Sequence, residues 1–277
     1  MLGKTNIIIN KNSAAVLIDC SYYIFYRYFA TYRWFIFQKK IFDVNTITEN
    51  KEFVEAFIKH LNSDLKKIMK KWKTSIDNII LCMDCPRSKI WRNDIFPVYK
   101  ASRTQNINFN CNIFRVFNEY IASLHIKQIY FNRLEGDDIV YLIQKNIKEW
   151  FANLKIVQKI IIITNDNDYL QLADKNVNII NMQMKDITSR GTKNSQVDLV
   201  IKAIIGDKSD NIPKISSYMT KDKALSIAMM TEQERFIWLK EKNLLDKFNL
   251  NMNLISFDNI PKELVADFYE NNIITVE

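Results

Sequence analysis

Acidic residues follow short apolar runs at three places in this sequence of 277 residues. Asp19 comes directly after AAVLI and Asp84 directly after NIILCM, while Asp166 and Asp168 lie just beyond four consecutive isoleucines. Short apolar runs of this kind predict buried strands of a parallel sheet, and the carboxyl ends of such strands meet at one edge. We therefore expect these four carboxylates to lie close together.

Two further acidic groups occur in the chain. The segment EGDD opens an expected helix and contributes Glu135, Asp137 and Asp138, of which the first and last share a helix face. The turn GDKSDNIP contributes Asp207 and Asp210. Each group also has a structural explanation, because acids at a helix start favour the helix dipole and such turns are common in loops.

Many carboxylates in one pocket require neutralising cations. Two unit charges about 4 Å apart repel by roughly 4 kcal/mol at an effective dielectric near 20, against a typical domain stability of about 5–15 kcal/mol. Oxygen-only ligands favour Mg²⁺ or Mn²⁺ over zinc. Two such ions can activate a water and stabilise the entering and leaving oxygens at phosphorus, which predicts phosphodiester hydrolysis. A glycosidase would need only a pair of acids.

The elements that would position these acids alternate along the chain. Strands are expected at 14–18, 78–83, 125–131, 160–163 and 177–181, and helices at 49–73, 135–151 and 196–205. This alternation predicts an α/β fold with a mainly parallel central sheet flanked by helices. Beyond residue 205 the strand pattern fades and helices are expected at 221–230 and 231–242. We place the α/β domain at 1–195 and a helical C-terminal subdomain, with the last acidic motif and a duplex-binding region, at 196–277.

Composition narrows the class of protein. The net charge of +8 favours a polyanionic partner such as nucleic acid. No apolar stretch approaches the roughly 20 residues of a membrane span, and the start MLGKTNIIINKN lacks the features of a signal peptide. Four cysteines are too few for a disulfide framework. We expect a cytoplasmic monomer that does not bind membranes.

Five blocks carry a resemblance to a known family. They are LIDCSYYIFYR at 17–27, WRNDIFPVYKASR at 91–103, LEGDDIVYLI at 134–143, ITNDNDYLQL at 163–172 and GDKSDNIP at 206–213. In this order and spacing the sequence resembles the flap endonuclease and 5′-3′ exonuclease superfamily, and within it the branch of the T-even bacteriophage ribonuclease H. The resemblance implies the PIN-like 5′-nuclease fold and a bacteriophage origin, with the host cytoplasm as its location.

The resemblance also implies a two-ion metal site. The ions would be Mg²⁺, for which Mn²⁺ would substitute. The implied ligands are Asp19, Asp84, Glu135, Asp137, Asp138, Asp166, Asp168, Asp207 and Asp210. Those nearer the first ion would be Asp19, Asp84, Asp137 and Asp166, and those nearer the second Asp168, Asp207 and Asp210. Asp19, Asp84 and Asp166 would take part directly in catalysis.

Cationic residues would complete the implied site. Lys100 and Arg103 would contact the scissile phosphate and stabilise the charge that develops there. Tyr99 would stack on a terminal base, and Tyr22 would either do the same or belong to the core. Residues 85–110 resemble the family's arch over single-stranded 5′ ends.

Further nucleic-acid contacts are expected in and beyond this arch. The candidates are Arg87, Lys89, Arg92, Lys214, Lys221 and Lys223. For the last three, solvated lysines are an equal alternative. Family members usually carry a glycine-rich hairpin after the last acidic motif, whereas KISSYMTKDKAL contains no glycine. How duplex would be held is therefore left open.

The function that the resemblance implies is removal of RNA primers and adjoining DNA during lagging-strand replication. The substrates would be DNA and RNA–DNA hybrids with a 5′ end or flap, and a single-strand-binding protein or sliding clamp would be the protein partner. One alternative is a PIN-like single-stranded ribonuclease, which the GDKSDNIP block and the arch disfavour. Another is a catalytically silent DNA-binding relative, which would normally have lost acids that are all present here.

Overall fold

A five-stranded parallel sheet forms the centre of the computed structural model, which describes residues 4–104, 106–156 and 158–277. The strand order is β4-β3-β2-β5-β6. Their bounds are β2 Ala15–Asp19, β3 Ile79–Met83, β4 Lys127–Tyr130, β5 Ile160–Ile163 and β6 Val177–Ile180. All five overlap the predicted ranges, and the predicted parallel sheet is confirmed.

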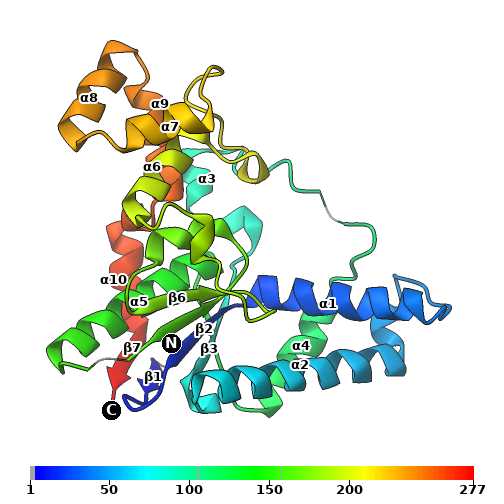
Figure 1. Cartoon of the computed structure of the whole chain (residues 1–277). Helices are drawn as coiled ribbons and strands as arrows, with labels where there is room; N and C mark the ends of the chain where they lie inside the picture. The colour runs from blue at the N-terminus through cyan, green and yellow to red at the C-terminus, as the bar shows by residue number, and fades with distance from the viewer. Residues whose placement is uncertain (1–3, 105, 157) are drawn as a thin grey trace.

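Helices cover both faces of this sheet (Figure 1). One face packs against α1 (Cys20–Phe37), α2 (Lys51–Trp72) and α4 (Ile113–Ser123), and the other against α5 (Gly136–Asn153). Val16 and Ile18 of β2 lie in the core cluster between the sheet and α1, α2 and α4, whereas Ala15 and Leu17 lie in the core cluster between the sheet and α5. Because both faces are buried, the strands are continuous apolar runs. Every helix in the described part of the chain is too short or too polar to cross a membrane.

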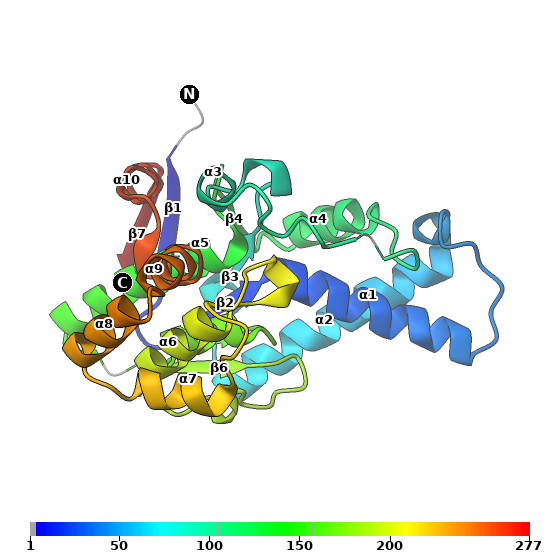
Figure 2. The same ribbon diagram turned by 90° about the horizontal axis from the view of Figure 1, so that it is seen from above.

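The paired helices α1 and α2 extend well beyond the sheet (Figures 1 and 2). Helix α2 begins at an N-cap, Asn50, whose side chain accepts a hydrogen bond from the Phe53 amide at 3.0 Å. The Tyr23 hydroxyl of α1 donates to the Leu61 carbonyl at 3.0 Å, and Arg27 pairs with the buried Asp64. These contacts fix the two helices to each other.

A third core cluster lies in the C-terminal part. It contains α6 (Ser195–Ile205), α7 (Lys221–Ala228), α8 (Glu232–Glu241) and α9 (Leu245–Ile255). The helices predicted here are confirmed. The division into two parts at residue 195 stays a prediction. Phe257 and Phe268, which follow these helices in the sequence, pack into the core of the α/β part.

The end of the chain forms a strand, which the sequence pattern did not indicate. After α10 (Lys262–Asn271), β7 (Asn272–Val276) pairs in parallel with β1 (Thr5–Ile9) as a second, two-stranded sheet. The strand β7 therefore adds to the helices that were predicted after residue 205. Each strand has its partner at the opposite end of the chain, so no local pattern predicts their pairing.

The segment between β3 and α4 contains residues 85–110, for which an arch is predicted. Its first part includes α3 (Arg92–Ile95) and packs into the C-terminal core cluster through Ile90 and Tyr99. After Arg103 the chain crosses towards the projecting part of α1 (Figure 1). There the ring centroids of Phe109 and Tyr28 lie 4.8 Å apart. The segment is therefore held at both ends by different parts of the fold.

Candidate metal centre

The predicted acids gather at the carboxyl edge of the sheet. Asp19 ends β2, Asp84 follows β3 and Asp166 follows β5, and these three strands are neighbours with β2 in the middle. Along the chain, β3 and β4 are added on one side of β2, and β5 and β6 on the other side. Open α/β sheets bind ligands at such a switch point. A cleft of about 1500 Å³ opens there. Seven of the nine predicted acids line it, namely Asp19, Asp84, Glu135, Asp137, Asp166, Asp168 and Asp207, and the other two are buried.

Asp19 is positioned by the helix that follows it. As the N-cap of α1 it accepts a hydrogen bond from the Tyr22 amide at 3.0 Å. The Thr164 hydroxyl, after β5, donates to its other oxygen at 3.0 Å. One short side chain thus joins the ends of two neighbouring strands and turns its carboxylate towards the cleft.

Asp84 is positioned by the start of α5. It accepts hydrogen bonds from the Gly136 amide at 2.6 Å and from the Ser21 hydroxyl. A Cβ atom at Gly136 would lie 2.9 Å from the Cys82 carbonyl oxygen and 3.1 Å from Asp84 Oδ1. Glycine in the EGDD segment therefore permits the close approach of α5 to β3.

The first acid group, which we define as Asp19, Asp84, Asp137 and Asp166, has no ion-pair partner among the described residues. Burial, and then the Asp84 charge, raise the pKa of Asp19 to about 7. Burial, followed by Glu135 and Asp138, raises the pKa of Asp137 well above its usual range. Hard oxygen donors with uncompensated charge fit a divalent cation.

A buried hydroxyl at the same place supports this fit. Tyr169 is 1% exposed, and its hydroxyl has no hydrogen-bond partner among the residues that the structure describes. Burial, and then the charges of Asp19 and Asp137, raise the pKa of Tyr169. A hydrated cation held by the first acid group would offer this hydroxyl a water partner.

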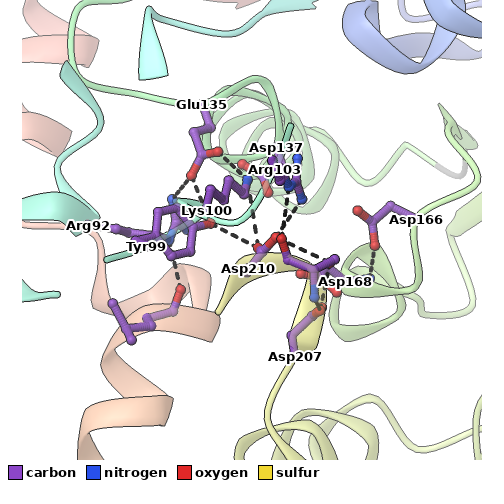
Figure 3. Close-up of polar contacts among 12 residues, drawn as sticks. Arg92, Tyr99, Lys100, Arg103, Glu135, Asp137, Asp166, Asp168, Asp207 and Asp210 are labelled. Atoms are coloured by element: carbon purple, nitrogen blue, oxygen red, sulfur yellow. Dashed lines mark hydrogen bonds and ion pairs between the residues drawn. The ribbon is translucent and has the colours of Figure 1, made fainter. Parts of the chain in front are cut away.

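The second acid group, which we define as Asp168, Asp207 and Asp210, has carboxylate oxygens within 4.8 Å of one another. Figure 3 shows these side chains converging from separate segments. Unlike the first group, it is paired with cations. Lys202 contacts Asp168 and lies 2.9 Å from Asp207, while Arg103 pairs with Asp210. Although burial opposes it, Lys202 lowers the pKa of Asp207 to about 2.

The turn at 206–213 holds its acids by backbone geometry. Asp207 and Ile212 exchange two backbone hydrogen bonds of 2.8 Å, and the Asp207 side chain accepts from the Ser209 amide at 2.7 Å. Gly206 has a φ of +71°, and a Cβ atom there would lie 2.4 Å from the Ile212 carbonyl oxygen. Only glycine fits this position, which turns the end of α6 into the acidic loop.

Arg92 is buried rather than available to nucleic acid. It is 2% exposed, donates to both oxygens of Asp138 at 2.9 and 2.7 Å, and reaches Glu135 at 2.9 Å and the Leu254 carbonyl at 2.7 Å. Its burial contradicts the predicted nucleic-acid contact. Asp138, 0% exposed and also bonded to the Trp91 indole at 3.0 Å, has both oxygens occupied and does not line the cleft.

Tyr99 is also turned inward. It is 5% exposed, and its hydroxyl lies 3.1 Å from Glu135 and 3.2 Å from Asp210 (Figure 3). Its ring is therefore unavailable for stacking on a base, contrary to the prediction. The hydroxyl instead links the start of α5 to the acidic turn.

Lys100 and Arg103 both line the cleft. Lys100 pairs with Glu135 and lies 3.7 Å from Asp210. Burial alone would lower the pKa of Lys100, but Glu135 and Asp210 raise it, so the ammonium stays charged. The Arg103 side chain is 40% exposed and remains accessible from the cleft. Both cations therefore lie beside the acids.

The remaining predicted contacts fall into two sets. Arg87, Lys214 and Lys221 line the cleft, whereas Lys89 and Lys223 are exposed outside it. Arg87 donates to the Arg103 carbonyl at 2.8 Å, and Lys214 to a carbonyl at 3.0 Å. The structure thus brings only part of the predicted basic set to the acids.

Sequence reasoning missed several residues of the cleft, among them two cations beside the acids and an aromatic ring. Lys202 and Arg190 line it, as does Phe25, which is 38% exposed. Tyr22 lines it too, with its hydroxyl accepting from a backbone amide at 3.0 Å. A signal for Lys202 was present, since it is the one charge within the apolar run LVIKAII. Phe25 follows Tyr22 by one helical turn.

Comparison with known proteins agrees with this geometry. The family described as 5′-3′ exonuclease, N-terminal resolvase-like domain, matches residues 14–199. The chain belongs to this family. Similar proteins include the 5′-3′ exonuclease of Mycoplasmopsis pulmonis, 27% identical over 86% of this chain and 74% of that one. The ribonuclease H of Enterobacteria phage T4 is 25% identical over 76% of this chain and 75% of its own length.

Solved structures show the same fold. The D15 protein of bacteriophage T5, co-crystallised with metal ions, has a TM-score of 0.58 at 14% identity and covers 92% of this chain and 96% of its own. A variant of this flap endonuclease, in a complex with DNA and metal ions, has a TM-score of 0.59 at 15% identity with the same coverage. As a member of the 5′-3′ exonuclease family, the chain is a phosphodiester hydrolase.

Proposed function

We propose that this chain is an Mg²⁺-dependent 5′-3′ exonuclease and flap endonuclease, which cuts near 5′ ends of DNA and RNA–DNA hybrids. The observation that carries the proposal is the convergence of Asp19, Asp84 and Asp166, which have no ion-pair partner among the described residues, in the cleft that Lys100 and Arg103 also line. Uncompensated carboxylates in a cleft fit divalent cations. The partly exposed Arg103 and the more deeply buried Lys100, which also lines the cleft, are cations that fit a phosphate.

The two acid groups would hold one ion each. The first would take Asp19, Asp84, Asp137 and Asp166, and the second Asp168, Asp207 and Asp210. Glu135 supports the site by holding Lys100 in place, since the two side chains pair in a buried position. Bound divalent ions supply Lewis acidity and an activated water at phosphorus. Mn²⁺, with similar oxygen preference, would substitute for Mg²⁺.

Lys100 and Arg103 would bind the scissile phosphate. The Arg103 guanidinium can donate two hydrogen bonds to phosphate oxygens, and the Lys100 ammonium adds a fixed charge. Because Lys100 donates its backbone amide to the Asp210 carbonyl at 3.0 Å, its position is tied to the acidic turn. Both cations would stabilise negative charge as it grows on the phosphate.

The biological role that we propose is removal of RNA primers and adjoining DNA during lagging-strand replication, in the cytoplasm of a bacteriophage host. The similarity to a curated ribonuclease H from phage T4 supports an RNA-containing substrate. All acids that a silent DNA-binding relative would normally have lost are present. A single-strand-binding protein or sliding clamp as partner stays a prediction.

The test compares wild type with Asp84→Asn and Asp168→Asn on a 5′-labelled RNA–DNA hybrid and a 5′-flap duplex. Wild type should release short 5′ products with Mg²⁺ and none with EDTA. Each variant should lose at least about 100-fold in rate, because each removes a ligand charge that would hold an ion at the reacting phosphate. Binding of the flap duplex, measured in EDTA, should remain.

Asp267→Asn is the matched control, since it makes the same change on an exposed residue of α10, outside the cleft. It should cut at the wild-type rate. If wild type binds both substrates but cuts neither with any divalent cation, the proposed activity is refuted. Preference for single-stranded RNA over both duplex substrates would instead favour the ribonuclease alternative.

A further inference from the structure

Lys202 occupies an unusual position for a lysine. It lies on α6, its side chain is 19% exposed, and its ammonium is shared between Asp168 and Asp207. Asp168 belongs to the loop after β5 and Asp207 to the turn after α6. The ammonium therefore joins two segments that both contribute to the second acid group.

The two acid groups consequently differ in charge balance. Asp168 and Asp207 face Lys202, and Asp210 faces Arg103 with Lys100 at 3.7 Å. Within the described part of the chain, the first acid group has no such partner within ion-pair distance. The fold thus neutralises one group with its own side chains and leaves the other for an external cation.

This arrangement sets a condition on ion binding. A divalent cation entering between Asp168 and Asp207 would meet the Lys202 ammonium, which lies 2.9 Å from an Asp207 oxygen. Like charges at such separations repel strongly in a partly buried cleft. Lys202 must therefore leave its carboxylates before the cation can use them, and Arg103 must likewise leave Asp210.

We propose that Lys202 is a built-in counterion, which keeps the second acid group from binding a divalent cation until a nucleic-acid backbone draws Lys202 and Arg103 onto its phosphates. The inference rests on the proposed function, because it assigns the two groups to two ions. Ions then load in order, the first group before the second. By linkage, strand binding and second-ion binding strengthen each other by the same factor.

The direct test is ion binding by the metal-stripped protein without any substrate. A titration with Mn²⁺ is monitored by calorimetry and by the electron paramagnetic resonance signal of free Mn²⁺. It gives the number of bound ions and the affinity of each. Wild type should bind one ion well and the second at least about tenfold more weakly. Lys202→Met, which keeps the stem but removes the charge, should tighten the second ion by on the order of tenfold.

Three further variants separate charge from structure. Lys202→Arg should resemble wild type, because it restores the positive charge. Lys202→Gln is a second neutral variant in case Lys202→Met does not fold, and folding of each is checked by circular dichroism. Lys208→Met is the matched control, since this exposed lysine lines the same cleft without pairing to an acid among the described residues. Its second-ion affinity should change by less than about threefold.

An added oligonucleotide supplies a second readout, in wild type and in Lys202→Met. A single-stranded phosphorothioate oligonucleotide, checked for integrity after the titration, should tighten the second Mn²⁺ ion by about tenfold in wild type and by much less in Lys202→Met. If wild type binds two ions equally well without the oligonucleotide, the counterion role is refuted. It is also refuted if the neutral variants bind the second ion no more tightly than wild type.

The ion titration and the cleavage assay test the counterion role and the proposed activity separately. If the neutral variants gain second-ion affinity but wild type cuts no 5′ substrate, the counterion stands and the proposed activity fails. If wild type cuts a 5′ flap with Mg²⁺ while Lys202 variants leave the ion affinities unchanged, the activity stands and the counterion fails.

Discussion

Individual carboxylates in this cleft have very different electrostatic surroundings. Burial and the neighbouring Asp84 raise the pKa of Asp19 to about 7, whereas Lys202 holds the pKa of Asp207 at about 2 despite burial. Both residues belong to the same cleft and both are proposed metal ligands. The two pKa values differ because a cationic side chain contacts Asp207 but not Asp19. The raised pKa of Asp19 leads to a prediction for stability.

Asp19 should make the metal-free protein less stable as pH rises. Its pKa near 7 in the folded state lies above the unfolded value of about 3.9, so the folded state binds more protons between those values. The free energy of unfolding should therefore fall by on the order of 2–4 kcal/mol from about pH 4 to pH 7 in EDTA. Urea unfolding across this range measures it.

Mg²⁺ and substitution provide the controls for this pH dependence. Saturating Mg²⁺ should reverse the fall, because it binds the ionised carboxylate. Asp19→Asn should reduce the slope without removing it, since the pKa of Asp137 is also raised by burial and by neighbouring acids. A metal-free protein that grows more stable between pH 4 and pH 7 would contradict the proposed charge repulsion.

Arg92 should matter for stability more than for substrate binding. Arg92→Met would leave the buried Asp138 and Glu135 without their shared partner, and breaking such a pair costs about 3–5 kcal/mol. Urea unfolding at neutral pH measures this loss. The control is Arg115→Met, because Arg115 pairs with Glu119 on the surface and its loss should cost under about 1 kcal/mol. Equal effects of both variants would disprove a structural role for Arg92.

Loops and helix starts at the sheet edge decide where the acids lie. The start of α5 approaches β3 closely because Gly136 has no side chain, and the turn after α6 depends on Gly206. The structure thus uses two of the four glycines of this chain to place acidic segments. Neither position tolerates a Cβ atom without movement of backbone atoms nearby.

Gly206→Ala should disrupt the second acid group. The backbone at Gly206, with φ of 71° and ψ of −172°, is essentially restricted to glycine. A Cβ atom would also lie 2.4 to 2.6 Å from backbone atoms of Ile212 and Pro213. We expect a loss of about 2–3 kcal/mol in unfolding free energy and a large fall in cleavage rate. Ser217→Ala, on a nearby exposed serine, should change stability by under about 0.5 kcal/mol.

The whole molecule combines an acidic cleft with a net charge of +8. The net positive charge attracts a polyanion to the protein, whereas the acidic side chains of the cleft attract cations. The crossing segment after Arg103 and the projecting α1 lie on the same side of the molecule (Figure 1). We propose that basic residues lining the cleft, among them Lys221 and Lys214, contact the phosphates of a bound strand.

Salt should weaken binding of a 5′-flap duplex in a measurable way. Affinity in EDTA, measured by fluorescence anisotropy from about 50 to 200 mM KCl, should fall along a straight line on logarithmic axes. Lys221→Ala should reduce the slope by about 0.9 if this cleft lysine contacts one phosphate. Lys262→Ala, on exposed α10 and outside the cleft, should leave the slope unchanged. An unaltered slope for both would remove Lys221 from the binding surface.

The sequence alone was sufficient for the five strands of the central sheet, for the acids at their carboxyl ends and for the family. These features depend on residues that are adjacent in the chain, such as the four isoleucines before Asp166. The tertiary structure decided the burial of Arg92 and Tyr99, the pairing of β1 with β7, and the placement of Lys202 between Asp168 and Asp207. Whether a cationic side chain contacts a carboxylate or solvent depends on which distant segments pack together. The spacing of residues along the sequence does not show this.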